Sequence, residues 1–233
     1  MTALGPRIAS ALLRKTGRRY ALDPRLPITM VLGVVVTAGF ELLHGMLRVR
    51  RLIFIGRGTR VRGRSQISFG RYCSIGRYCT IDGYSGALGV VLGANSRIGD
   101  FSRITVTSHM SLVGAGLRLG AGSGLGDYTH LGCAGGVVIG SNVICGSYVS
   151  FHSQNHNFED DSRLIREQGT SELPITIGDN CWIGAKATFL AGASIGSGCV
   201  VAAGAVVRDQ FGDDCVIAGV PARLVKSRVE PRD

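Results

Sequence analysis

Aromatic residues are scarce in this chain, and several common catalytic and metal-binding motifs are missing. Only 6% of the residues are aromatic, whereas 35 of the 233 are glycine. This balance excludes a broad aromatic core and favours tight turns around a narrow aliphatic one. No Cys-x-x-Cys pair or Cys/His cluster suggests zinc. No Walker loop or dinucleotide fingerprint occurs either, so the chemistry has to come from a less common set of residues.

Aliphatic residues recur every six positions near the C-terminus. The spacing of six runs through Ile177, Ile183, Phe189, Ile195, Val201 and Val207. Four residues after each of the first five stands a small side chain, namely Cys181, Ala187, Ala193, Cys199 and Ala205. A helix needs a period near 3.6 and a strand a period of 2, whereas six is the hexapeptide repeat of a β-helix. The fold class predicted is all-β, a left-handed parallel β-helix with three hexapeptides to each coil.

The same spacing of six, which we call the ladder, continues toward the N-terminus with occasional shifts in register. Its shorter runs are Cys133 to Phe151, Val113 to Leu131, Leu92 to Ile104, Phe69 to Ile81, and Ile55 with Val61. One interruption is large, because Phe151 and Ile177 stand 26 residues apart and the interval fails the pattern. We therefore expect a loop over 153–174 extruded from a β-helix domain over 52–226, followed by a tail over 227–233.

Acidic residues are nearly absent from the first third of the chain. Residues 1–71 hold 14 of the 26 Lys/Arg residues against only Asp23 and Glu41, whereas the remainder is close to neutral. A globally basic protein would suggest nucleic acid, but a basic end on a neutral body suggests something local to that end. We expect no nucleic-acid partner.

The segment 1–51 is basic and apolar and is expected to be helical. A cleaved signal peptide does not fit, because the apolar core begins too far into the chain. A membrane-crossing helix fits poorly, since the run before Glu41 is about 15 residues against the ~20 needed. A helix on the anionic cytoplasmic face of a membrane and a helix capping the first coil both remain open, and they are compatible.

The seven cysteines fall mostly on repeat positions. Cys73, Cys79, Cys181 and Cys199 stand at the small inward position, and Cys133 and Cys145 at the aliphatic one. Buried thiols behave as small hydrophobes. Reduced core thiols fit the cytosol, so the expected localisation is cytoplasmic, with peripheral contact at the inner face of the membrane through residues 1–51.

Histidine in the expected loop is the main candidate for chemistry. His156 lies in Ser153-Gln154-Asn155-His156-Asn157-Phe158, and Glu159, Asp160 and Asp161 follow it. Histidine suits general-base work near neutral pH, and a carboxylate could orient its ring. His130 stands directly before Leu131, a residue of the six-residue spacing, and 26 residues before His156. That offset is about one coil plus an insertion, so His130 could line the same groove as His156.

Four stretches carry a resemblance to a known family. They are Asn155 to Phe158, Pro174 to Ala185 with its Cys181-Trp182-Ile183-Gly184, and Val201 to Val207 followed by Ala218-Gly219-Val220-Pro221-Ala222-Arg223. In order and spacing the chain resembles the hexapeptide-repeat acyltransferases. It looks most like the maltose/galactoside O-acetyltransferase branch and the O-acetyltransferases of polysaccharide biosynthesis, of colanic acid or capsule type.

The resemblance implies an acetyl-CoA-dependent O-acetyltransferase that acts on a sugar hydroxyl of a surface polysaccharide or its precursor. His156 would be the general base, and His130 and Asn155 would contact the acceptor. A homotrimer would hold acetyl-CoA in clefts between subunits. The implied acetyl-CoA contacts are Ala185, Ala203, Gly204, Arg208, Arg223 and Lys226. The chain departs from the family at Arg208-Asp209-Gln210, where Thr-Lys-Asp is usual.

Other functions on the same coil stay open. An amino-sugar N-acyltransferase or a serine acetyltransferase-like enzyme would share the fold. A γ-carbonic anhydrase-like metal enzyme would need three converging histidines, and only His109, His130, His152 and His156 are available in the coils. A non-catalytic scaffold would have no need of a loop that carries a histidine. No metal ligands are expected.

Overall fold

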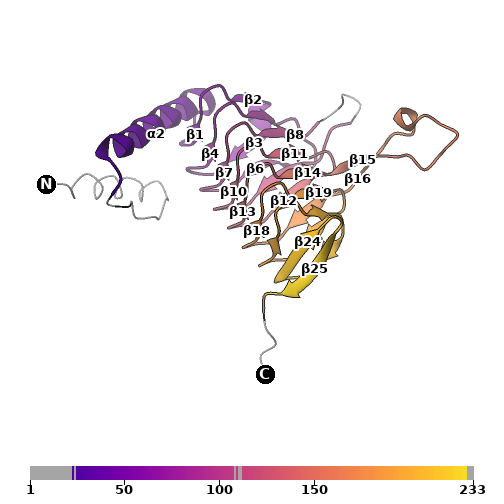
Figure 1. The fold of residues 1–233 in the computed structure, drawn as a ribbon. Coiled ribbons are helices and arrows are strands. Elements are labelled where there is room, and N and C mark those ends of the chain that lie inside the picture. Colours follow the sequence, from indigo (N-terminus) through magenta and orange to yellow (C-terminus); the bar gives the residue numbers. More distant parts are fainter. Residues whose placement is uncertain (1–22, 24, 108, 110–111, 230–233) are drawn as a thin grey trace.

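The chain winds into a three-sided parallel β-helix, with a long helix at its N-terminal end (Figure 1). The computed structural model describes residues 23, 25–107, 109 and 112–229. Each coil contributes one strand to each of three sheets, so neighbours within a sheet come from successive coils. The pairing is parallel in register throughout, apart from β25 at the C-terminal end and the separate pair β15–β16. The left-handed β-helix fold predicted from the hexapeptide period is confirmed.

The strands are short. The nine-stranded sheet holds β1 (Phe54–Ile55), β4 (Ser74–Ile75), β7 (Arg97–Ile98), β10 (Gly124–Leu125), β13 (Ile144–Cys145), β18 (Trp182–Ile183), β21 (Val200–Val201), β24 (Cys215–Gly219) and β25 (Ala222–Ser227). One seven-stranded sheet holds β2 (Arg60–Arg62), β5 (Thr80–Asp82), β8 (Arg103–Thr105), β11 (His130–Gly132), β14 (Ser150–His152), β19 (Thr188–Leu190) and β22 (Val206–Val207). The other holds β3 (Ile67–Phe69), β6 (Gly89–Leu92), β9 (Gly116–Leu119), β12 (Val137–Ile139), β17 (Ile175–Ile177), β20 (Ser194–Ile195) and β23 (Gln210–Phe211).

Insertions at the corners explain where the sequence ladder slips. Trp182 pairs with Val200, 18 residues later, which is three uninterrupted hexapeptides. Ile144 pairs with Trp182, 38 residues later, because the loop 153–174 is inserted between β14 and β17. Another insertion separates β8 from β9, and it makes one predicted ladder position wrong. Val113 is exposed in that insertion, and Leu117 and Leu119 are the buried residues of β9.

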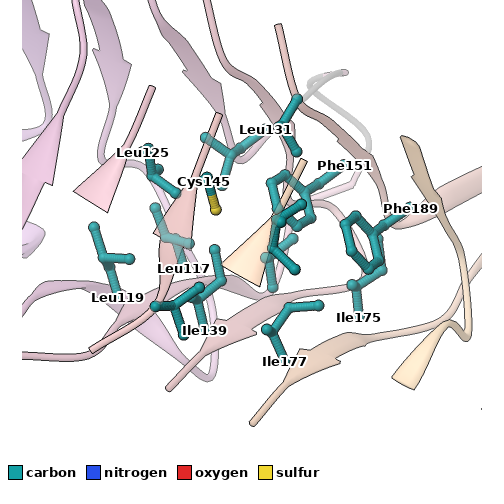
Figure 2. Packing of buried hydrophobic residues seen from close by; sticks show 14 of the residues in the cluster. Leu117, Leu119, Leu125, Leu131, Ile139, Cys145, Phe151, Ile175, Ile177 and Phe189 are labelled. Atoms are coloured by element: carbon teal, nitrogen blue, oxygen red, sulfur yellow. The ribbon is translucent and has the colours of Figure 1, made fainter. Parts of the chain in front are cut away.

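The core is a column of aliphatic side chains along the inside of the prism (Figure 2). Most strands point one side chain inward, whereas β6, β9, β12 and β17 point two, and most of these side chains are almost fully buried. Phe151 of β14 and Phe189 of β19 stack on neighbouring coils, with ring centroids 5.0 Å apart. Burial of each such side chain contributes roughly 1.5–3 kcal/mol. The coils on both sides of the extruded loop therefore remain packed against each other.

The cysteines are free thiols of this core. Six of them are buried, and only Cys215 in β24 is partly exposed. Burial raises the pKa of Cys73 and of Cys145 to about 12 and that of Cys181 to about 11. Thiols held protonated in this way are weak nucleophiles, and they serve as packing groups.

In the described part of the chain, a long helix precedes the coils. It is α2 (Ile28–Val49), and it is long and apolar enough to cross a membrane by length and composition alone. Its C-terminal half lies on the first coil, and its N-terminal half projects away from the coils (Figure 1). Apart from Asp23 and Arg25, the basic stretch 1–25 lies outside the described residues. The divisions at residues 51 and 226 stay predictions.

Candidate active site

The extruded loop forms a hairpin that carries His156. β15 (Gln154–His156) pairs antiparallel with β16 (Thr170–Glu172), and His156 stands opposite Thr170. The Gln154 amide donates to Thr170 Oγ1 at 3.0 Å and to Glu172 Oε1 at 2.9 Å, which ties the two strands together. Hydrogen bonds from Thr170 and Gln154 also lower the pKa of Glu172. His156 therefore stands on a short ordered strand.

A buried serine anchors this hairpin to the coils. Ser153 is fully buried, and its hydroxyl donates to the Gly132 carbonyl at 2.8 Å and accepts from the Gly135 amide at 2.9 Å. The Leu173 amide closes the base of the hairpin by donating to the Ser153 carbonyl. A side chain at Gly135 would collide with that carbonyl oxygen. The hairpin is thus held at a fixed place beside β11.

The tip of the hairpin is braced by polar contacts away from His156. The Gln168 amide donates to the Asp160 carbonyl at 2.7 Å, and a one-turn helix, η2 (Ile165–Glu167), lies between the two. Asp160 accepts from Ser162, and Glu159 accepts from the Phe158 amide. Within the described chain, the exposed His156 ring has no hydrogen-bond partner. Glu159 and Asp160 thus stabilise the hairpin tip rather than orient the ring.

A cavity of about 560 Å³ opens at the base of the hairpin, on the outer face of β8, β11 and β14. His130 and His152 lie side by side in it, with ring centroids 5.6 Å apart. Its lining consists of Arg103, Thr105, His130, Gly132, Cys133, Ala134, His152, Ser153 and Gln154. His130 thus shares the cavity with Gln154, two residues before His156, whereas Asn155 and His156 are exposed on the hairpin beyond it.

Burial makes His130 a weaker base than usual. Desolvation lowers its pKa below the ordinary value of 6.5, and the neighbouring charges of His152 and Arg103 add to the effect. A neutral His130 ring can donate one hydrogen bond and accept another. In the described part of the chain, no three His, Cys, Asp or Glu residues are grouped as metal ligands.

The small residues implied to contact acetyl-CoA lie together at one corner of the late coils. The Gly204 amide donates to the Ala185 carbonyl at 2.9 Å, so the two stand on neighbouring coils, and Ala203 is exposed beside them. On earlier coils, the same corner carries stacked aromatic rings at Tyr78, Phe101, Tyr128 and Tyr148. In this column Lys186 stands one coil after Tyr148, and Gly204 stands one coil after Lys186. The aromatic ladder therefore ends at Tyr148, and the corner becomes small at Gly204.

The implied phosphate contacts are brought together around an acidic residue. Asp209 Oδ2 lies 2.9 Å from Arg223 Nη1, and Asp209 Oδ1 lies 3.8 Å from Arg208 Nε. Lys226 lies further along β25, opposite Val216. All of these charged side chains are exposed, so the two arginines are accessible, but Asp209 competes for them.

Sequence reasoning missed some residues of this site. His152 directly follows the inward Phe151, as His130 directly precedes the inward Leu131, so both rings face outward on paired strands. Because each histidine is next to an inward residue of the six-residue spacing, the sequence could have indicated that His152 lies near His130. The sequence also contains a Gly-x-Ser-x-Gly spacing at Gly192–Gly196. It falls on β20 inside a regular coil, and not at the strand-to-helix turn that a nucleophile needs.

Comparison with known proteins agrees with the fold. Residues 174–208 match the family described as the hexapeptide repeat of succinyl-transferase. The chain is similar to the galactoside O-acetyltransferase of Escherichia coli K12, with 34% identity over 42% of this chain and 46% of that protein. It is also similar to an E. coli K12 protein named for O-acetyl transfer in lipopolysaccharide biosynthesis, with 33% identity over 39% of this chain and 50% of that protein.

Among solved structures, the N-acyltransferase AntD of Bacillus cereus superposes with a TM-score of 0.50 and 16% identity. The match covers 81% of this chain and 90% of that one. The chain is thus a hexapeptide-repeat β-helix. Its predicted resemblance to the hexapeptide-repeat acyltransferases is confirmed, although it spans half or less of the length of the curated relatives it matches.

Proposed function

We propose that this protein is an acetyl-CoA-dependent O-acetyltransferase that acts on a sugar hydroxyl of a surface polysaccharide or its precursor. The observation that carries the proposal is the anchored hairpin. It holds His156, whose ring has no hydrogen-bond partner in the described chain, beside the cavity lined by His130 and His152, and it precedes the stretch that matches the repeat family. The sugar O-acetyltransferases among the relatives support the reaction type.

In this mechanism His156 is the general base. Its imidazole takes the proton of the sugar hydroxyl as that oxygen attacks the carbonyl carbon of the acetyl thioester. The tetrahedral intermediate collapses, the carbon–sulfur bond breaks, and the CoA thiolate recovers the proton from the imidazolium. No acyl-enzyme forms, which agrees with the absence of a reactive thiol among the six buried cysteines. A base of this kind typically contributes about 10²–10⁴-fold to the rate.

The acceptor would occupy the cavity at the base of the hairpin. His130 contributes a polar ring from within the cavity, and Asn155 contributes an amide from the exposed strand next to His156. Arg103 on the cavity wall carries a positive charge that suits an acidic or phosphorylated sugar. These contacts would orient the hydroxyl, while His156 acts on its proton.

Acetyl-CoA would lie along the late corner of the prism. The small side chains at Ala185, Ala203 and Gly204 allow the pantetheine arm to approach the backbone closely. Arg208, Arg223 and Lys226 would pair with the phosphates of CoA. Binding would then displace Asp209 from Arg223, because the carboxylate and the phosphate need the same guanidinium.

We also propose a cytoplasmic homotrimer. Ile144 and Trp182 stand in register on the outer face of the nine-stranded sheet, and both are more than half exposed. Burial of this apolar pair against a second copy would stabilise an assembly, and clefts between copies would complete the acetyl-CoA sites.

The test follows thiol release from acetyl-CoA with a panel of sugars, amino sugars and lipid-linked oligosaccharides. We expect acceptor-dependent release that falls by about 10²–10⁴-fold in His156→Ala. Arg166→Ala is the matched control, because Arg166 is exposed in the same hairpin and makes no contact in the described chain. Full activity of His156→Ala would contradict the mechanism. Release with amino sugars alone would favour an N-acyltransferase, and no release with any acceptor would reject acyl transfer.

A further inference from the structure

The helix α2 presents an unusual amount of apolar surface to solvent. Its contacts with the coils come from the C-terminal half, where Gly45 is buried against Ile53 and the His44 Nδ1 lies 3.1 Å from the Ile55 carbonyl. Arg48 donates to the Thr59 carbonyl at 3.0 Å. The polar side chains of this half thus face the coils. The large apolar side chains left exposed are Ile28, Met30, Leu32, Val34, Val36, Phe40, Leu43, Met46 and Leu47.

An arginine cluster adjoins this apolar helix. A cavity of about 850 Å³ at the first coil is lined by Arg48, Arg50, Arg51 and Arg64, and no acidic residue lines it. Arg64 donates to the Arg48 carbonyl, which holds two of the four close together. Across the described residues, none of these four guanidiniums takes part in an ion pair. Four unneutralised guanidiniums in one hollow form a site for phosphate groups.

We propose that α2 and this arginine cluster together dock the protein on an anionic lipid bilayer. The apolar side chains of α2 enter one leaflet, and Arg48, Arg50, Arg51 and Arg64 contact the lipid phosphates. This combination of an apolar face and adjacent basic residues is the pattern of interfacial membrane helices. The inference does not depend on the proposed acyl transfer, because the docking surface is remote from the hairpin in the fold (Figure 1).

The helix binds from one side and does not cross the bilayer while it is attached to the coils. Glu41 lines the cavity between α2 and the first two coils, together with His44 and Arg77. The part of the helix before it, from Ile28 to Phe40, extends about 20 Å at 1.5 Å per residue. The hydrocarbon core of a bilayer is about 30 Å thick, so this part of the helix is too short to cross it.

Charge argues against a second copy of the chain as the occupant of this surface. A two-fold pairing through the same patch on both copies would bring the two arginine clusters toward each other. An anionic membrane instead supplies both the apolar phase and the counter-charge. A dimer through α2 is thus an outcome that the experiment must be able to detect.

The experiment measures flotation of the full-length chain with vesicles of phosphatidylcholine alone or mixed with phosphatidylglycerol. We expect binding to the anionic vesicles that weakens as salt is raised. Arg50→Gln/Arg51→Gln/Arg64→Gln should weaken it on the order of a hundredfold, since each basic residue near the surface contributes about fivefold. The matched control is Arg97→Gln/Arg118→Gln/Arg166→Gln, which removes three exposed arginines, two from later coils and one from the hairpin, and should bind like the parent chain.

A second variant tests the helix. Leu32→Gln/Val36→Gln/Phe40→Gln keeps the charge and should also lose vesicle binding, while circular dichroism verifies that the β-helix is intact. Phe40→Trp in a Trp182→Phe background should show a blue-shifted emission only with anionic vesicles. The proposal is overturned if the arginine variant floats like its control, or if the parent chain does not float. It is also overturned if light scattering without lipid shows a dimer of the parent chain that Leu32→Gln/Val36→Gln/Phe40→Gln abolishes.

Discussion

At the scale of single residues, His130 links burial to pH. Its ring is partly buried between Arg103 and His152, and desolvation together with these neighbours lowers its pKa. The unfolded chain, in which the ring titrates near 6.5, therefore binds more protons than the folded chain just below that pH. The stabilising contribution of the neutral ring is complete above about pH 6.5, and it is lost as the pH falls toward the folded-state pKa.

We expect the free energy of unfolding to decrease between pH 7 and pH 5, and to decrease less in His130→Asn. Urea unfolding of both proteins at the two pH values measures the difference. Glu159→Gln is a suitable control, because Glu159 is exposed at the hairpin tip and does not line the cavity. An equal pH dependence in His130→Asn and in the parent chain would show that His130 is not the titrating group.

Single residues also show how far sequence alone could lead. His156 was identifiable because it stands in an interruption of a strict period, where a solenoid has no structural need of it. The sequence could not decide whether a neighbouring carboxylate orients the His156 ring, because that depends on the hydrogen bonds that form at the hairpin tip. Glu159 and Asp160 make contacts within the tip, and no local sequence pattern indicates that choice.

At the scale of elements, the corner between the nine-stranded sheet and the β8–β11–β14 face carries a ladder of rings. Phe101 and Tyr128 have ring centroids 5.0 Å apart, and Tyr128 and Tyr148 have theirs 4.8 Å apart, with nearly parallel planes. Each of these residues has a positive φ, which is costly for a residue other than glycine. The stacking offsets part of that cost and joins successive coils along one edge.

We expect Tyr128→Ala to lower the free energy of unfolding by about 1–3 kcal/mol, since it removes two stacked pairs worth about 0.5–1.5 kcal/mol each. Tyr84→Ala is the control, because Tyr84 is also about half exposed and stacks on no other ring in the described chain. Urea unfolding followed by far-UV circular dichroism gives both values. Equal losses in the two variants would show that the ladder contributes nothing beyond the area that each ring covers.

The period of six was sufficient to predict the coils, because inward positions repeat wherever no residue is inserted. The period gave a wrong prediction at Val113. This residue has the right spacing from Leu119, but it lies in the insertion before β9, where the chain has left the coil. The helix α2 was expected as membrane-bound or as a cap. The structure places its C-terminal half on the first coil and leaves the other half exposed, an arrangement that only three-dimensional packing decides.

At the scale of the whole molecule, the proposed site is divided between distant parts of one prism. The hairpin projects from the side formed by β14, whereas Ala185 and Gly204 lie at a corner of later coils. If acetyl-CoA binds at that corner and the acceptor binds under the hairpin, a neighbouring copy can bring the two together. Trp182, in register with Ile144 on an exposed sheet face, is the residue best placed to hold such a neighbour.

We expect the parent chain to have three times the mass of one chain by light scattering, and Trp182→Glu to shift it toward the single chain. Burial of an unpaired carboxylate in an apolar contact is costly, so assembly should weaken while the coils remain folded. Val113→Glu is the control, because Val113 is equally exposed but lies in an insertion away from that sheet. Acyl transfer should fall in Trp182→Glu and recover as the protein concentration is raised, since mass action restores the trimer. A single-chain Trp182→Glu with full activity would show instead that one prism holds the complete site.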